Sequence, residues 1–142
     1  MNDIEIRSEQ RPELDALLGN SLYVFNSTTT GIRDGLLLNA SIEDEVGDIV
    51  AGISGHTWGG CCEIARLWVH ESMRGRGIGT SLMAAAEVEA VRRGCGQIVL
   101  STHSFQAPAF YEGLGFVKLA TVPNYPEGYA SLLYIKYLRP SD

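Results

Sequence analysis

The run from Arg74 to Gly79 places three glycines and two arginines in the order Arg-Gly-Arg-Gly-Ile-Gly. It lies between a segment typical of a strand and a segment with helical spacing of apolar residues. The first N–H groups of a helix have no partner within the helix, and the helix dipole adds partial positive charge there. Glycine lets the main chain approach an anion closely, and arginine adds fixed positive charge. The run therefore predicts a phosphate-binding turn at the start of a helix.

Two common phosphate motifs do not match this turn. The Walker motif requires Lys followed by Ser or Thr after its last glycine, whereas Ile78-Gly79-Thr80 follows Gly77 here. The dinucleotide fingerprint requires the spacing G-x-G-x-x-G within a parallel βαβ unit, and the glycines from Gly75 onward lack that spacing. We therefore do not expect ATP or NAD as the ligand.

The segments before the turn have the composition of antiparallel strands. A polar turn separates the first two, and Gly59-Gly60 favours a hairpin between the second and the third. The expected strands are 35–42, 49–57 and 61–69. Regular alternation in the last of them places Glu63 on the same face as Leu67 and Val69.

The other elements follow from similar signals. The Asn, Ser and Thr residues of 26–30 are typical of a loop, and Glu89 and Arg93 are expected to pair on the exposed side of the central helix. Helices are predicted from Pro12 to about Leu22, from the glycine-rich turn to Arg93 and from Pro108 to Leu114, and further strands over 4–7, 97–102, 116–122 and 129–138. This order predicts an α/β chain with a mixed sheet covered by helices.

Composition limits the functional classes. The chain has 142 residues and a net charge of −6, which fits one domain over 1–142 and argues against a nucleic-acid partner. No apolar run approaches the roughly 18 residues of a membrane span, and the N-terminus lacks a secretory pattern. We therefore expect a cytoplasmic protein with no membrane partner. Cys61, Cys62 and Cys95 are expected to be reduced thiols, and no metal-ligand spacing is present.

Two motifs give this chain a resemblance to the GCN5-related N-acetyltransferases, the GNAT family. The pyrophosphate loop of that family reads [Gln/Arg]-x-x-Gly-x-[Gly/Ala], which Arg74–Gly79 matches. The segment Ala107–Phe116 is similar to the family's Ala-x-x-Phe-Tyr-x-x-x-Gly-Phe. Together with the strand order, the resemblance covers nearly the whole chain. It implies a single-domain GNAT-like fold, with a mixed, mostly antiparallel sheet splayed in the middle and helices on both faces.

The resemblance implies acetyl-coenzyme A as the cosubstrate, bound in the split of the sheet, and no metal. Main-chain groups near Leu67 and Val69 are implied to bind the pantetheine arm and the acetyl carbonyl. Ser104 stands where many members have Asn, so it offers the pantetheine fewer hydrogen-bonding groups. The coenzyme-binding residues implied in this way are Leu67, Trp68, Val69, Arg74, Gly75, Arg76, Gly77, Ile78, Gly79, Thr80, Ser104, Ala107 and Phe110.

The implied reaction is direct attack of a neutral amine on the thioester in a ternary complex. Tyr111 is implied to lie near the coenzyme sulfur, where a phenol with a usual pKa of about 10 can protonate a leaving thiolate of about 8.5. Glu63 is the first candidate for the base, because it precedes Arg74 by the same spacing as the catalytic glutamate of the histone-acetylating members. His70 and His103 are alternative bases, since imidazole titrates near neutrality.

The acceptor is expected to be an amine of a small molecule or a peptide. Segments that border the acceptor side in the family contain the candidate pocket residues Phe25, Trp58, His103 and Tyr125. A homodimer is a further implication of the resemblance. The alternative function is a coenzyme-A-binding sensor without acetyl transfer. The presence of Tyr111 favours catalysis over this alternative.

Overall fold

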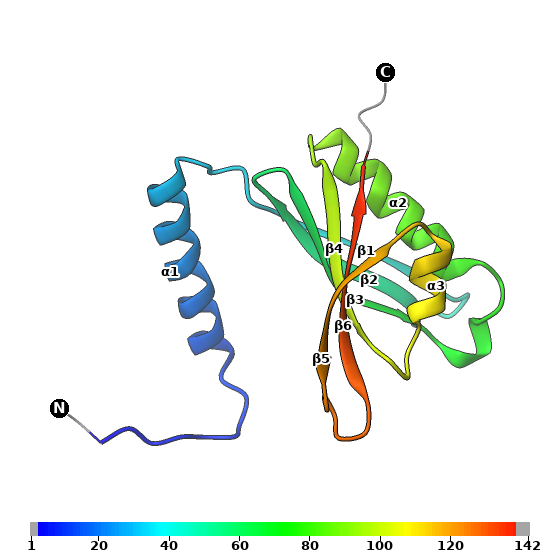
Figure 1. The fold of residues 1–142 in the computed structure, drawn as a ribbon, viewed down its shortest axis with the longest axis horizontal. Coiled ribbons are helices and arrows are strands. Elements are labelled where there is room, and N and C mark those ends of the chain that lie inside the picture. Colours follow the sequence, from blue (N-terminus) through cyan, green and yellow to red (C-terminus); the bar gives the residue numbers. More distant parts are fainter. Residues whose placement is uncertain (1–2, 139–142) are drawn as a thin grey trace. The chain divides into compact units, whose positions relative to one another are not determined.

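The structure, a computed structural model, describes residues 3–138, and the chain falls into two compact units divided between Arg33 and Asp34 (Figure 1). The N-terminal unit contains one helix, α1 (Pro12–Thr30), preceded by an irregular segment. Pro12 stands in the first turn, where its missing N–H breaks no helical hydrogen bond. The strand predicted over 4–7 is wrong, because this segment forms no strand in the described part of the unit. Four alternating residues make a strand only when a neighbouring strand bonds to them.

The end of α1 also differs from the prediction. The run 26–30, which was expected to form a loop, is helical. The Ser27 hydroxyl donates to the carbonyl of Tyr23 at 2.6 Å, and the Thr30 hydroxyl donates to the carbonyl four residues earlier at 2.7 Å. Because these polar side chains bond to the helix's own carbonyls, they do not interrupt the helix. Gly31 ends it in the left-handed conformation.

The C-terminal unit is built on a six-stranded sheet with the order β1-β2-β3-β4-β6-β5 (Figure 1). The strands β3 and β4 run parallel, and the other neighbouring strands pair antiparallel, which confirms the mixed, mostly antiparallel sheet. The strands are β1 (Leu36–Glu43), β2 (Ile49–Trp58), β3 (Cys61–Val69), β4 (Gln97–His103), β5 (Val117–Pro123) and β6 (Ala130–Tyr137).

Two helices of this unit, α2 (Ile78–Arg92) and α3 (Pro108–Gly113), are fastened to the same face of the sheet. Lys136 on β6 bonds to Glu87 on α2 at 2.9 Å, and the Tyr134 hydroxyl, two residues earlier on β6, donates to Glu112 on α3 at 3.1 Å. Helices on both faces of the sheet therefore stay a prediction. Neither these helices nor α1, within the described residues 3–138, is long and apolar enough to cross a membrane.

The core of this unit lies between the sheet and these helices. The helix α2 contributes an apolar stripe at helical spacing, and β3, β4 and β6 contribute every second residue over part of their length. The core side chains from these elements include Leu82, Met83, Ala86, Ala90, Cys62, Ile64, Ile98, Leu100, Tyr111, Leu132 and Tyr134. This packing holds α2 and the part of α3 that carries Tyr111 against the sheet.

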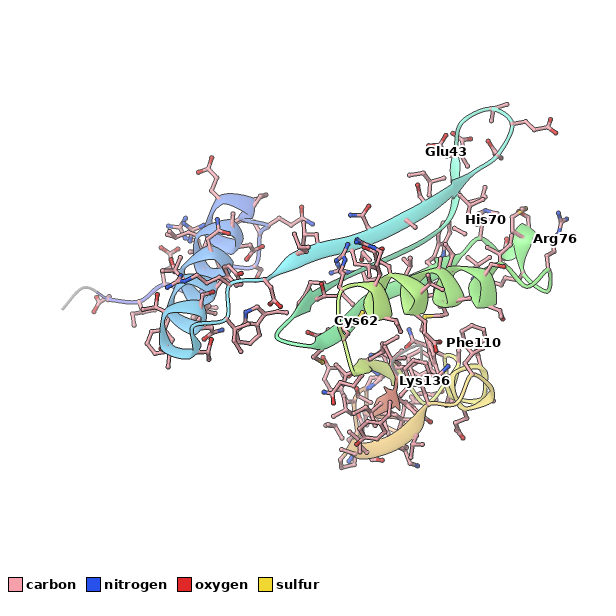
Figure 2. All side chains as sticks on the ribbon, turned by 90° about the horizontal axis from the view of Figure 1, so that it is seen from above. Glu43, Cys62, His70, Arg76, Phe110 and Lys136 are labelled. Carbon is pink, nitrogen blue, oxygen red and sulfur yellow. The ribbon has the colours of Figure 1, made fainter. Side chains whose placement is uncertain are left out.

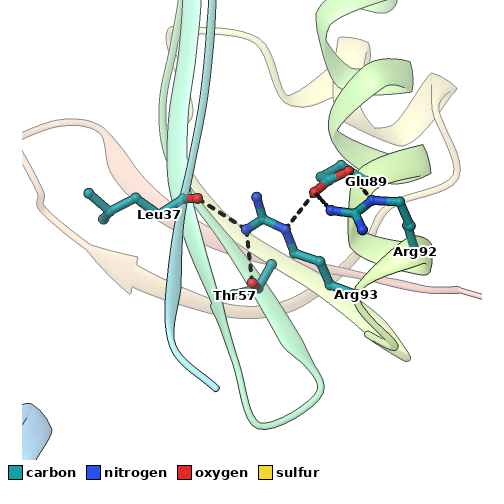
Figure 3. A network of polar contacts seen from close by, with 5 residues as sticks. All are labelled: Leu37, Thr57, Glu89, Arg92 and Arg93. Atoms are coloured by element: carbon teal, nitrogen blue, oxygen red, sulfur yellow. Dashed lines mark hydrogen bonds and ion pairs between the residues drawn. The ribbon is translucent and has the colours of Figure 1, made fainter. Parts of the chain in front are cut away.

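Arg93, which follows α2, fastens the helix to the first two strands (Figure 3). Its guanidinium donates to the carbonyl of Leu37 and to the hydroxyl of Thr57, each at 3.1 Å, and to the Glu89 carboxylate at 2.7 Å. Hydrogen bonds from Arg92 and Arg93 lower the pKa of Glu89 to about 2. The predicted exposed position of the Glu89–Arg93 pair is wrong for Arg93, whose side chain is only 17% exposed. It turns toward the strands because the buried Thr57 hydroxyl and the Leu37 carbonyl lie within its reach.

We expect Arg93→Lys to lower the free energy of unfolding by about 1–3 kcal/mol, because the buried Thr57 hydroxyl and the exposed Leu37 carbonyl both lose a donor. Arg92→Lys is the matched control, since Arg92 is 69% exposed and bonds only to Glu89 among the described residues. Its effect should stay below about 0.5 kcal/mol. Urea unfolding followed by tryptophan fluorescence measures both. Equal losses of unfolding free energy in the two variants would show that Arg93 stabilises the fold through its charge alone, without a contribution from its hydrogen bonds to the strands.

Candidate active site

The central parallel pair of strands separates halfway along its length. The pairing of β3 with β4 ends at Ile64 opposite Leu100. At the same point the register of β3 against β2 shifts, so that Ala65 becomes the extra residue of a β-bulge. Beyond the bulge, the N–H and C=O groups on the facing edges of β3 and β4 do not bond to each other. These groups must find other partners.

The bulge also changes which side chains of β3 share a face. Leu67 and Val69, beyond the bulge, pack against the core under α2. Glu63, before the bulge, is exposed and lies beside His56 on β2, with 3.5 Å between Glu63 Oε2 and His56 Nε2. The predicted common face of Glu63, Leu67 and Val69 is therefore wrong. Regular alternation fails because Ala65 adds one residue between them.

A cavity of about 340 Å³ lies where the two strands separate. One wall is β3 beyond the bulge, and the other is formed by the end of β4 and the start of α3. Four residues predicted from the sequence line it together: Leu67, Trp68, Ala107 and Tyr111. The splayed sheet and the second motif thus meet in one cleft.

Tyr111 is held in this cleft by its helix and by two aromatic neighbours. Phe110 and Phe116 contact its ring edge to face, with centroid distances of 5.1 and 5.8 Å. The side chain is 8% exposed, and within residues 3–138 its hydroxyl bonds to no other group. Burial raises the pKa of the phenol, so the hydroxyl keeps its proton at neutral pH. Tyr111 can therefore donate that proton to a ligand in the cleft.

The glycine-rich turn follows β3 and a short 3-10 helix, η1 (Glu71–Met73), and leads directly into α2. Gly75 and Gly77 have φ angles of 79° and 77°, in the left-handed region that glycine favours. A Cβ at either position would meet no described atom within 4 Å, and no side chain caps the start of α2. The main chain of the turn is therefore open to an anion, with unpaired N–H groups at the helix start.

The side chains of the turn divide between structure and solvent. Arg74 Nε donates to the carbonyl of Val69 at 2.9 Å, which fixes the turn to the end of β3. Arg76 lies at the outer end of the turn (Figure 2). A Cβ on Gly79 would stand 3.3 Å from the ring of Phe110, so the glycine lets α2 and α3 approach each other. Phe110 thus has a packing role, and its contact with the coenzyme stays a prediction.

The other predicted residues lie near the cleft or apart from it. Ser104 accepts a hydrogen bond from the Ala130 N–H at 3.0 Å, and its pantetheine contact stays a prediction. His103 and Tyr125 are brought together, with His103 Nδ1 2.9 Å from the Tyr125 carbonyl oxygen. Trp58 ends β2 and is not among the residues that line the cleft. Phe25 lies on α1 in the N-terminal unit, and its contact with the acceptor stays a prediction.

Sequence reasoning missed several residues that line the cleft. Gln106 is the clearest, because its side-chain oxygen accepts from the His103 N–H at 2.7 Å and from the Thr102 hydroxyl at 3.2 Å. Arg66 and Ser101 also line the cavity. Their position depends on the bulge and on the separation of β3 from β4, for which the local sequence offers no motif.

The model of the Acetyltransferase (GNAT) family matches residues 4–116, which include the turn, the cleft and Tyr111. The chain belongs to the GNAT family. It is 38% identical over 95 residues to Blasticidin-S acetyltransferase from Streptomyces morookaense, which covers 66% of this chain and 70% of the relative. It is 34% identical over 110 residues to Acetyltransferase Atu2258 from Agrobacterium fabrum, covering 78% of this chain and 80% of the relative.

The similarity extends to the three-dimensional structure of this GNAT protein. A crystal structure of an acetyltransferase from Bacillus cereus superposes with a TM-score of 0.77 at 28% identity, covering 95% of this chain and 98% of the other. Together with the family match and the relatives, this makes the protein a GNAT-type, acyl-CoA-dependent N-acyltransferase.

We expect Gly77→Ala to weaken the binding of coenzyme A about tenfold or more, because hydrogen bonds from the turn to a charged diphosphate are worth about 1.5–3 kcal/mol each. Gly47→Ala is the matched control, since Gly47 also has a positive φ, 91°, and free space around it, but lies in the β1–β2 turn. Both variants should lose stability through backbone strain. Isothermal titration calorimetry separates the two, and equal affinities would contradict the anion site.

Proposed function

We propose that this GNAT protein transfers the acetyl group of acetyl-coenzyme A to a primary amine of a small molecule or peptide. The observation that carries the proposal is the cleft between β3 and β4, which Tyr111 lines. The glycine-rich turn comes after β3, one of the two strands that form this cleft. The Blasticidin-S acetyltransferase relative supports an acceptor of the small-molecule class. We also propose that residues 1–142 form one catalytic domain and act in the cytoplasm, where the free thiols stay reduced.

The coenzyme's parts fit different features of the C-terminal unit. The diphosphate fits the open main chain of 75–80, with Arg74 and Arg76 adding positive charge. The pantetheine amides fit the unpaired edge of β3 at 67–69, which an extended ligand can complete as an added strand does. The thioester then reaches the part of the cleft lined by Tyr111. Ser104, Ala107 and Phe110 are proposed as further contacts of the arm.

The proposed reaction has one bond-forming and one bond-breaking step. The amine nitrogen attacks the thioester carbonyl carbon, and the carbon–sulfur bond then breaks. Main-chain N–H groups near Leu67–Val69 stabilise the negative charge on the carbonyl oxygen. Tyr111 gives its proton to the leaving thiolate, and its raised pKa keeps it protonated until then.

The proton that the amine loses must pass to a base. We propose Glu63 for this role, with His70 and His103 as alternatives. Glu63 is about half exposed beside His56, so it is open to a ligand on that face of the sheet. His70 Nδ1 accepts from the Ser72 N–H at 3.1 Å, which commits that nitrogen to the segment before the turn.

We expect Tyr111→Phe to lower kcat about a hundredfold, because general acid catalysis contributes about 10²–10⁴. The KM for acetyl-coenzyme A should change little, since the ring remains. Tyr137→Phe is the control, because it removes a hydroxyl on β6 at Gln97, the start of β4, whereas the cleft is lined by the end of that strand. Thiol release measured with a chromogenic reagent gives both constants. Unchanged kcat in Tyr111→Phe would exclude its acid role, and coenzyme binding without any thiol release by the wild type would favour a sensor.

We expect Glu63→Gln to reduce kcat/KM for the acceptor about a hundredfold at neutral pH, because the amine then lacks its proton acceptor. The defect should shrink as the pH rises, since more of the amine is already neutral. Glu43→Gln on exposed β1 is the control. A pH series of thiol release measures the effect. A Glu63→Gln variant with wild-type kcat/KM at every pH would transfer the base role to one of the histidines.

A further inference from the structure

Four aromatic rings form a continuous cluster where β4 ends and the β5–β6 hairpin turns. We call His103, Phe105, Tyr125 and Tyr129 the aromatic cluster. The His103 and Phe105 rings are stacked, with centroids 5.3 Å apart and planes 3° from parallel. His103 also contacts Tyr125 at 5.1 Å, and Phe105 contacts Tyr129 edge to face at 5.1 Å. Each ring therefore touches at least one other.

Hydrogen bonds between the two segments hold the aromatic cluster in place. Ser104 exchanges two bonds with Ala130, one through its N–H at 2.8 Å and one through its hydroxyl at 3.0 Å. His103 Nδ1 lies 2.9 Å from the carbonyl oxygen of Tyr125 and donates to it, because a carbonyl can only accept. Gln106, which lines the cleft, accepts from the His103 N–H. The cluster is thus a fixed surface bonded to the wall of the cleft.

The rings of the cluster are not used to build the core. Phe105, Tyr125 and Tyr129 are 54%, 58% and 53% exposed, whereas the core aromatic Tyr134 is fully buried. A contiguous group of exposed aromatic rings beside a cleft is typical of a binding surface. Its position next to the proposed thioester site makes the acceptor amine its natural ligand.

Charge identifies the kind of acceptor. The segments 103–106 and 123–129, which carry the rings of the aromatic cluster, contain no Lys or Arg, and the second contains Glu127. The face of an aromatic ring attracts cations, and a planar guanidinium also stacks on it. The aromatic cluster can therefore hold a positively charged group of the acceptor.

We propose that the aromatic cluster binds the acceptor through a second, planar cationic group, such as a guanidinium, while the primary amine enters the cleft. This inference rests on the proposed acetyl transfer and adds the class of acceptor: an amine that carries a planar cation at a distance. The rings contribute cation–π and stacking contacts, and the segments that carry them add no Lys or Arg.

The test compares two acceptors of equal shape, 4-aminobutylguanidine and 4-aminobutylurea, which differ in the charge of the planar group. We expect kcat/KM to be about five to thirty times higher for the guanidine, the range of a cation–π contact from exposed to desolvated. In the Phe105→Leu/Tyr129→Leu variant the two acceptors should become nearly equal, while the KM for acetyl-coenzyme A stays unchanged. Comparing the ratio between proteins removes any difference in intrinsic reactivity of the two amines.

Tyr137→Leu is the matched control, because Tyr137 is also an exposed ring. It lies on β6 and pairs with Gln97 at the start of β4, whereas the aromatic cluster lies at the end of β4. It should keep the wild-type preference. Calorimetry with the two acceptors and coenzyme-A-saturated protein gives a readout independent of turnover. A binding preference without acetylation would leave the inference standing and remove the proposed function. Equal binding of both compounds by the wild type, or an unchanged preference in the double variant, would overturn the inference.

Discussion

The site depends on one interruption of backbone hydrogen bonding, at which β3 stops pairing with β4 beyond Ile64. A parallel pair that continued would use the main-chain groups of 65–69 for the sheet itself. The bulge at Ala65 bends the strand and leaves these groups for a ligand. Gly55 makes the bulge sterically feasible, because a Cβ there would overlap the carbonyl oxygen of Glu63 on the neighbouring strand. A single glycine on β2 thus supports the cleft between two other strands.

Charge is distributed in the C-terminal unit in the way that its proposed substrates require. The diphosphate of the coenzyme is negative, and the turn offers it Arg74, Arg76 and the start of α2. The proposed acceptor is positive, and the aromatic cluster lies on the segments 103–106 and 123–129, which contain no Lys or Arg. The overall charge of −6 is therefore less informative than its local distribution. The two ligands would be drawn to different segments of the C-terminal unit.

The features that sequence reasoning predicted correctly are local. The glycine-rich turn, the start of α2 and the placement of Tyr111 on α3 follow from contiguous residues, whose spacing determines their structure. The face of Glu63 and the position of Gln106 depend on the register between strands far apart in the chain, which alternation alone does not contain. The polar run 26–30 shows that a local pattern can also be ambiguous. Ser and Thr side chains can bond to the helix's own carbonyls as well as interrupt the helix.

The cysteines bear on whether the acetyl group passes directly to the amine. An acyl-enzyme route through cysteine would need a thiolate near the thioester. Burial, reinforced by neighbouring Cys95 and Cys61, raises the pKa of Cys62 to about 11, so its thiol stays protonated at neutral pH. Cys61 and Cys62 also lie at the start of β3, where the strand still pairs with β4, before the bulge that opens the cleft. These positions argue against an acetyl-cysteine intermediate, and they agree with the proposed direct attack, in which the cleft aligns two substrates and Tyr111 donates a proton.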